Sequence, residues 1–238
     1  MSEGERLVPD GCVDVLWAGS DHLWICGPER RAWRSSRPEG TEAVGVRLRP
    51  GAARHLLKTD VHHVVDRRLR VAEVRSPAHE RMLLDRLEGS DDPLHVLVAE
   101  VRRWRDRSEP PSAQDEAIVR AATARRPLGV GALAEGLGVT PRHLHRRSLR
   151  LFGYSYSVLV RLLRFQRFLH QARLRPGTGM AAAAAVAGYA DQAHLVRECR
   201  SITGLAPGAL LAETDATFPT WWSDPYKTDE PRACGLGA

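Results

Sequence analysis

The sequence contains no long hydrophobic run, and this absence excludes a membrane-spanning helix. A helix that crosses a bilayer needs about 20 consecutive apolar residues, whereas the most apolar stretch, Met180 to Ala190, is short and consists mostly of alanine. The N-terminal residues Met1 to Arg6 are polar and acidic, and no apolar segment follows them. The sequence therefore predicts no secretory signal, and we expect the chain to stay in the cytoplasm, with no membrane partner.

Cysteine is too scarce to build a disulfide framework. The 238 residues include four cysteines, and no two of them have the CxxC spacing of a zinc or redox motif. We therefore expect reduced thiols at Cys12, Cys26, Cys199 and Cys234.

Motifs of nucleotide-dependent enzymes are also missing. Neither GxGxxG nor GxxxxGK followed by Ser or Thr occurs, so no loop that cradles nucleotide phosphates is predicted. His62 and His63, with Asp60 and Asp66 nearby, could bind a metal ion. Adjacent histidines on a strand point to opposite faces, so we expect no metal site there. We predict no catalytic residue and no cofactor.

Cys12 and Asp14 leave one enzymatic interpretation open. Together they could form a thiol site near a cupin-like pocket, although a small buried cysteine is the more common role. The alternative function is therefore a small-molecule or thiol-modifying enzyme whose basic domain only localises it on nucleic acid. A protein-binding adaptor is a third class, and its affinity for a partner would depend little on salt.

The excess positive charge is confined to one part of the chain. Residues 1–111 contain 19 Lys and Arg against 19 Asp and Glu, residues 112–213 contain 14 against 6, and residues 214–238 contain 2 against 4. The three segments thus carry charges of 0, +8 and −2. Neutralisation of phosphates drives most nucleic-acid affinity, so this asymmetry indicates a polyanion-binding module joined to a neutral one. Charge alone is equally compatible with an arginine-rich solvated surface.

The first 107 residues predict a small β-rich domain with covering helices. Short runs rich in Val and Trp alternate with Gly, Ser, Asp and Pro, which is typical of a small sheet. The predicted strands are 13–17, 22–26 and 43–48, and the predicted helices are 51–57, 78–87 and 93–107. A sheet of three or four strands is thin, so we expect helices to cover one of its faces.

A Pro-rich segment, residues 108–112, predicts a linker to a helical domain over 113–213, which makes the fold class α+β. The predicted helices are 113–125, 130–137, 141–152, 155–174, 180–187, 192–203 and 207–213. Residues 214–238 contain prolines and scattered acidic residues, and we expect a poorly ordered tail. Trp221 and Trp222 in that tail have no assigned role.

Residues 134–144 have the layout of a helix-turn-helix. Ala134 is small where two helices cross, Gly138 can take the positive φ of the turn, and Leu144 fills the core from the second helix. Thr140 followed by Pro141 is an N-cap with proline at the first helical position, which fixes where the second helix begins. The outward positions of that helix, which we expect to contact DNA, are Arg142, His145, Arg146 and Arg150.

A second copy follows, with one extra residue in its turn. Ala184, Gly188 and Leu195 repeat the small residue, the turn glycine and the core leucine, and Asp191 caps the next helix. The outward positions expected to contact DNA are Gln192, Val196 and Arg197. The helix between the copies would span about 30 Å, close to the ~34 Å of one DNA turn, so both recognition helices could enter successive major grooves.

Residues 112–213 resemble the DNA-binding domain of AraC-type transcription regulators. Its second half typically reads Gly-aromatic, Asp-Gln, His, Arg and Thr-Gly-x-x-Pro, matched here by Gly188-Tyr189, Asp191-Gln192, His194, Arg197 and Thr203-Gly204-Leu205-Ala206-Pro207. The first half agrees through Leu133-Ala134, Gly138 to Leu144, Arg146 and Phe152-Gly153. Ser148 and Cys199 stand where the family usually buries a Phe, which implies looser packing of both recognition helices.

The front half resembles, more distantly, the small β-rich sensor domain of one group of these regulators, through Leu7 to Asp14 and Val46 to Gly51. That domain normally has residues before the Pro-Asp-Gly segment, so we expect either an incomplete sensor or a misplaced start site. The resemblance implies a sequence-specific regulator of promoter DNA, with RNA polymerase and a second copy of the chain as further partners. A small-molecule effector, if there is one, would shift the orientation or dimerisation of the DNA-binding domain, and the sequence identifies neither its existence nor its chemistry.

Overall fold

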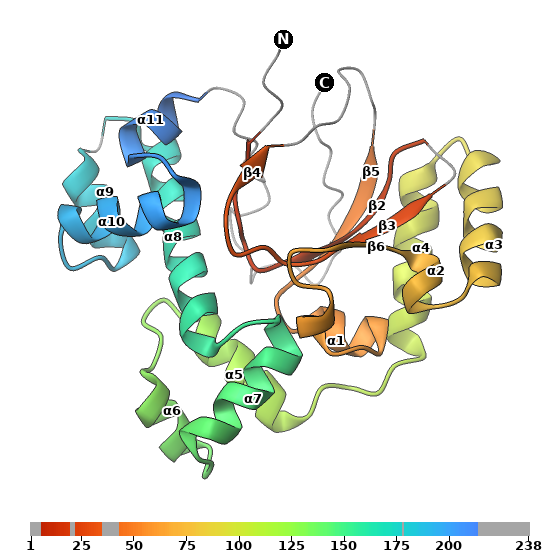
Figure 1. Cartoon of the computed structure of the whole chain (residues 1–238), viewed down its shortest axis with the longest axis horizontal. Coiled ribbons are helices and arrows are strands. Elements are labelled where there is room, and N and C mark those ends of the chain that lie inside the picture. The colour runs from red at the N-terminus through yellow and green to blue at the C-terminus, as the bar shows by residue number, and fades with distance from the viewer. Residues whose placement is uncertain (1–5, 20–21, 35–42, 178, 214–238) are drawn as a thin grey trace.

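The computed structural model describes residues 6–19, 22–34, 43–177 and 179–213, and its fold is α+β as predicted (Figure 1). The strands are β1 (Arg6–Leu7), β2 (Val13–Trp17), β3 (Leu23–Cys26), β4 (Trp33–Arg34), β5 (Val44–Leu48) and β6 (Arg68–Arg70). The helices are α1 (Ala52–Leu57), α2 (Val71–Val74), α3 (Pro77–Glu88), α4 (Pro93–Asp106), α5 (Ala113–Thr123), α6 (Val130–Gly136), α7 (Pro141–Phe152), α8 (Tyr156–Leu174), α9 (Met180–Ala187), α10 (Gln192–Thr203) and α11 (Pro207–Ala212), with a 3-10 turn η1 (Val61–His63).

The N-terminal half is built on an antiparallel sheet with strand order β5-β2-β3-β6. Val15 on the central strand β2 lies opposite Ile25 on β3 and Val46 on β5, and all three are buried on one face. That face packs on the helices, with Leu87 of α3 and Leu97 of α4 in the same core. Valine and isoleucine at alternate positions therefore place one side of the sheet in the core.

Several short elements were not predicted from the sequence. They are β1, β4, β6, α2 and η1, each of two to four residues. Segments this short contain too few residues to show a hydrophobic period. The expectation that His62 and His63 lie on a strand was wrong, because both belong to η1 and their ring centroids are 4.0 Å apart.

The helical half begins at α5 and contains a core of its own. The side chains of Ser112 and Ser155 accept hydrogen bonds from backbone amides in the first turns of α5 and α8, and thereby fix where these helices begin. The long helix α8 runs from the group α5–α7 to the group α9–α11 (Figure 1). Phe165 and Phe168 on α8 are fully buried in the core that joins both groups.

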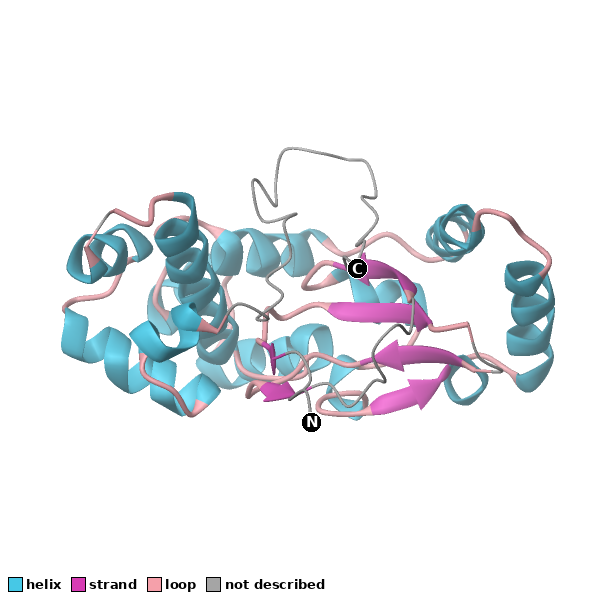
Figure 2. Ribbon diagram, turned by 90° about the horizontal axis from the view of Figure 1, so that it is seen from above, coloured by secondary structure: helices cyan, strands magenta, loops and turns pink. Residues whose placement is uncertain are grey.

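The two halves are in direct contact beside the sheet (Figure 2). A Cβ on Gly153, whose φ is +82°, would lie 2.0 Å from Cγ2 of Val65, so only glycine allows this approach. Nε2 of Gln166 on α8 donates to the carbonyl oxygen of Pro9 at 2.8 Å. The hydroxyl of Ser108 donates to the carbonyl oxygen of His55 at 2.9 Å, which ties the predicted linker to α1.

The boundaries 1–107, 108–112, 113–213 and 214–238 stay predictions, and the tail with Trp221 and Trp222 lies outside the described residues. Among the described residues, no helix is both long enough and apolar enough to span a membrane.

Candidate DNA-binding surface

The first helix-turn-helix has the geometry that its sequence predicts. Gly138 has φ +64°, and the amide of Val139 donates to the carbonyl oxygen of Ala134 at 2.9 Å, which closes the turn after α6. The hydroxyl of Thr140 accepts from the amide of His143 at 3.1 Å. That bond caps α7, so the recognition helix begins at the expected residue.

The second unit repeats these bonds. Gly188 has φ +91°, and the amide of Tyr189 donates to the carbonyl oxygen of Ala184 at 3.0 Å. The carboxylate of Asp191 accepts from the amide of His194 at 2.6 Å and caps α10. The two units are therefore structural copies, each with a left-handed glycine and a side-chain cap.

Both recognition helices bury the faces opposite their predicted outward positions. Leu144 and Leu151 are 1% exposed on α7, and Leu195, Cys199 and Ile202 are 0%, 0% and 1% exposed on α10. These side chains fix the rotation of each helix about its axis, and so decide which residues face outward.

Ser148 lies at the inward position of α7 that corresponds to Cys199 on α10. It is 0% exposed, and its hydroxyl donates to the carbonyl oxygen of Leu144 at 2.8 Å. Burial raises the pKa of the Cys199 thiol, so the thiol stays protonated. Whether a larger side chain would fit at either position stays a prediction.

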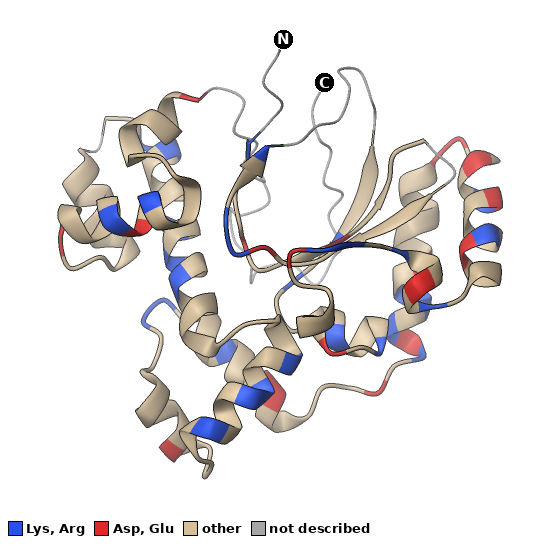
Figure 3. Cartoon of the chain, in the orientation of Figure 1, with Lys and Arg blue, Asp and Glu red and all other residues tan. Residues whose placement is uncertain are grey.

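The predicted DNA-contacting residues form two groups, one on each recognition helix. Six of them are exposed and Val196 is half-buried, and they are Arg142, His145, Arg146 and Arg150 on α7 and Gln192, Val196 and Arg197 on α10. Figure 3 shows arginines along α7, α8 and α10. The positive charge of the C-terminal half therefore includes both recognition helices.

Arg150 differs from the other exposed arginines of α7, because it contacts the N-terminal half. Its Nε lies 3.1 Å from Oδ2 of Asp60, and its side chain is 49% exposed. Asp60 also accepts a bond from Nε of Arg54 at 3.0 Å. Although burial raises the pKa of Asp60, the two arginines lower it below its ordinary value, so the carboxylate stays ionised.

Sequence reasoning missed the ion pair that anchors α7 to α5. Nε of Arg147 donates to Oδ1 of Asp115 at 2.5 Å, and Nη2 of Arg147 lies 2.5 Å from the hydroxyl of Ser112. Burial raises the pKa of Asp115, but the hydrogen bonds from Arg147 and Ser112 lower it below its ordinary value. Arg147 follows Arg146 in an arginine-rich run, so the sequence held no signal that one would turn inward.

A second cluster anchors α10 to α8. Nη2 of Arg164 lies 2.7 Å from Oε2 of Glu198, and the hydroxyl of Tyr189 donates to Oε1 of Glu198 at 2.8 Å. The ring of His194 packs edge-on against Tyr189, with ring centroids 5.2 Å apart. Tyr189 and His194, which belong to the matched motif, thus hold the second recognition helix in place.

The environment of Cys12, the candidate thiol nucleophile, disfavours the reactive thiolate form. Cys12 is 5% exposed, and burial, with Asp10 adding to it, raises the pKa of its thiol well above the ordinary value. A reactive cysteine needs a lowered pKa. Within the residues that the structure describes, no group of three or more His, Cys, Asp or Glu side chains could hold a metal ion.

Comparisons with known protein families match two parts of the chain. Residues 133–213 match the family model of a helix-turn-helix domain, and residues 2–70 match a domain of unknown function, DUF6597. No curated protein matches the chain. Among solved structures, an apo variant of ToxT from Vibrio cholerae is 10% identical, with a TM-score of 0.44, over 88% of this chain and 91% of that one. The match over residues 133–213, the two recognition helices and the motif over residues 188–207 give the chain an AraC-type helix-turn-helix domain, which supports a DNA-binding transcription regulator.

Proposed function

We propose that the chain binds double-stranded promoter DNA by inserting α7 and α10 into successive major grooves. The observation that carries this proposal is the repeat of one recognition geometry at a spacing of 51 residues, from Leu144 to Leu195 and from Gly153 to Gly204. The connecting helix α8 has 19 residues, which corresponds to about 28 Å at 1.5 Å per residue. That length suits recognition helices about one DNA turn, ~34 Å, apart.

The exposed side chains of each helix suit direct contact with bases. Arg146 and Arg197 hold the same position in the two copies, two residues after the core leucines Leu144 and Leu195. An arginine at the floor of the major groove can donate two hydrogen bonds to guanine. The proposed base readers are Arg142, His145 and Arg146 in one groove and Gln192, Val196 and Arg197 in the next. Val196 is apolar, and would contact a thymine methyl group.

Arg150 is assigned to the phosphate backbone, because it lies one turn beyond Arg146 on the same face of α7. Its pair with Asp60 holds it in the absence of DNA, so a phosphate oxygen would have to replace that carboxylate. Contacts of this kind release counterions, and the affinity should fall as the salt concentration rises.

Control by an effector is part of the same proposal. The two halves of the chain share direct contacts at α7 and α8, so a ligand of the N-terminal half would change the placement of the recognition helices. A homodimer and a contact with RNA polymerase are the further partners that we propose.

A randomised-site DNA selection tests the proposed base contacts. Arg146→Ala and Arg197→Ala should each relax base preference in a different half-site, about 10 bp apart. The loss of discrimination should be ~1 to 3 kcal/mol at the affected bases. Arg120→Ala is the matched control, because Arg120 is an exposed arginine of α5 that pairs with Glu116. A uniform loss of affinity for all sequences in Arg146→Ala would contradict the assignment of Arg146 as a base reader.

A further inference from the structure

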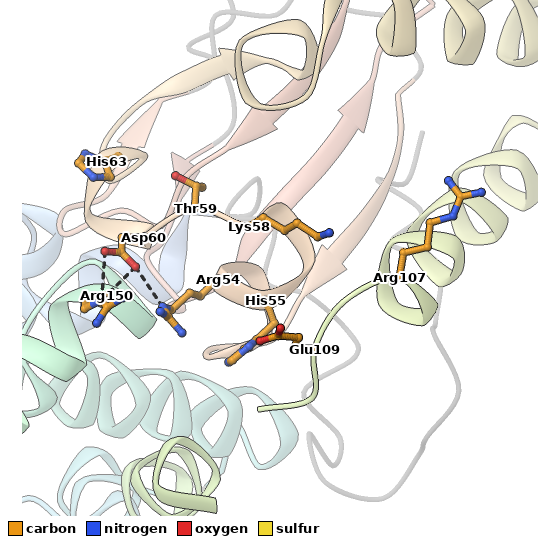
Figure 4. A pocket seen from close by; sticks show the side chains of 9 residues that line it. All are labelled: Arg54, His55, Lys58, Thr59, Asp60, His63, Arg107, Glu109 and Arg150. Carbon is orange, nitrogen blue, oxygen red and sulfur yellow. Dashed lines mark hydrogen bonds and ion pairs between the residues drawn. The ribbon is translucent and has the colours of Figure 1, made fainter. Parts of the chain in front are cut away.

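A pocket lies where the N-terminal half, the linker and the recognition helix α7 meet (Figure 4). Its volume is about 630 Å³, and small-molecule sites occupy about 300–1,000 Å³. We call it the junction pocket. The residues that matter for its chemistry are Arg54, Lys58, Asp60, Arg107, Glu109 and Arg150.

Positive charge dominates this pocket. Four of the six residues are cationic and two are anionic. The cations come from three separate parts of the chain, namely α1 and the residue after it, the end of α4, and α7. Like charges repel one another when they are held together, so an anion bound among them would relieve that repulsion.

The carboxylate of Asp60 occupies only a small part of the arginines' hydrogen-bonding capacity. Nε of Arg54 lies 3.0 Å from Oδ1 of Asp60, and Nε of Arg150 lies 3.2 Å from Oδ1 and 3.1 Å from Oδ2. In the part of the chain that the structure describes, the Nη groups of these two arginines form no hydrogen bond. A guanidinium carries about five N–H donors, so most of the donors on both arginines remain for a ligand.

The other two cations have no partner among residues 6–19, 22–34, 43–177 and 179–213. Lys58 follows α1 with φ +54°. This is a left-handed backbone conformation that residues other than Gly, Asn and Asp seldom adopt. Arg107 follows α4 and is exposed. Figure 4 shows both side chains extended beside the pocket. They can therefore move onto a ligand without breaking an existing ion pair.

We propose that the junction pocket binds a small phosphorylated molecule that carries at least two negative charges. Arginine binds phosphate oxygens bidentately and lysine binds them as a point charge, so this set of side chains suits a phosphoryl group. The site is a concave pocket, which fits a small ligand. Such a ligand would contact the N-terminal half, the linker and Arg150 of α7 together, and would hold the recognition helix in one position.

Binding is tested on the full-length chain without DNA, so its result does not depend on the proposed DNA contacts. The probe is inorganic pyrophosphate, titrated by calorimetry at constant ionic strength. We expect saturable binding at one site, and a loss of affinity of about tenfold in Lys58→Gln and in Arg107→Gln, as expected when one charge-assisted hydrogen bond is removed. Arg81→Gln removes an exposed charge of α3 outside the pocket, and should bind pyrophosphate like the wild type.

Four results would overturn the proposal. The first is pyrophosphate binding that does not saturate, and the second is an equal loss of affinity in Arg81→Gln, since both indicate general screening of charge. The third is unchanged pyrophosphate binding in Lys58→Gln and Arg107→Gln together with weaker DNA binding, which would make these residues part of the DNA surface. The fourth is tighter binding of citrate than of pyrophosphate, which would show that the pocket prefers a carboxylate ligand to a phosphoryl ligand.

Discussion

Arg147 and Glu198 occupy equivalent positions on the two recognition helices, yet they carry opposite charges. Arg147 pairs with Asp115 on α5 at 2.5 Å, and Glu198 pairs with Arg164 on α8 at 2.7 Å. In each unit the pair joins the recognition helix to the helix that precedes the unit. Both units thus place an ion pair at this position of the recognition helix, with opposite polarity, because attraction between two side chains does not depend on which of them carries which sign.

The pair between Asp115 and Arg147 should contribute to stability. Asp115 is 4% exposed, so Asp115→Ala would leave the part-buried guanidinium of Arg147 without its carboxylate. We expect the free energy of unfolding to fall by about 2 kcal/mol, measured by urea denaturation. Glu116→Ala is the control, because Glu116 forms an exposed pair with Arg120 and its loss should change stability by less than ~0.5 kcal/mol. Equal effects of the two variants would contradict this role.

Stability should also depend on pH through Asp115. Its pKa is lower in the folded chain than the ordinary 3.8, so the carboxylate stabilises the fold above that value. The stabilisation is lost as the pH falls through the folded-state pKa. We expect the difference in unfolding free energy between the wild type and Asp115→Asn to be largest near neutral pH and to shrink below about pH 4. Urea denaturation at several pH values measures that difference, and a constant difference down to pH 2 would refute the assignment.

The turn glycines should resist substitution for conformational reasons alone. Gly138 has φ +64° and no atom within 4 Å of a Cβ built on it, so Gly138→Ala introduces backbone strain without a clash. We expect a loss of about 1 kcal/mol. Gly136→Ala is the matched control, since Gly136 also has open space around it but lies within α6, where alanine should stabilise by about 0.5–1 kcal/mol. Thermal unfolding of both variants should give shifts of opposite sign.

The ion pair between Arg150 and Asp60 should compete with DNA. Asp60→Asn removes the carboxylate that binds Arg150, and the guanidinium becomes available to a phosphate. We expect DNA affinity at fixed salt to rise about threefold, with a steeper dependence on salt concentration. Asp66→Asn also removes one negative charge, from an exposed ion pair with Arg30, and serves as the control. The same gain in both variants would mean that net charge alone is responsible.

Local sequence signals were sufficient for the helical half because its elements end at residues with distinct backbone preferences. Gly138 and Gly188 adopt positive φ, and Thr140 and Asp191 cap the helices that follow. Leucines at helical spacing then predicted which faces are buried. The short strands β1, β4 and β6 had no comparable signal, because two or three residues cannot show an alternating pattern.

The sequence by itself determined the two recognition helices, their outward residues and the confinement of excess positive charge to the C-terminal half. These features depend on residues within a few positions of one another, or on composition. Only the tertiary structure decided that Arg147 turns inward to Asp115 while Arg146 faces outward, and that Arg150 meets Asp60, 90 residues away in the chain. Arginines in one run are chemically identical, so their partners are chosen by how distant helices pack. The junction pocket exists for the same reason, since its cations come together only after the two halves are in contact.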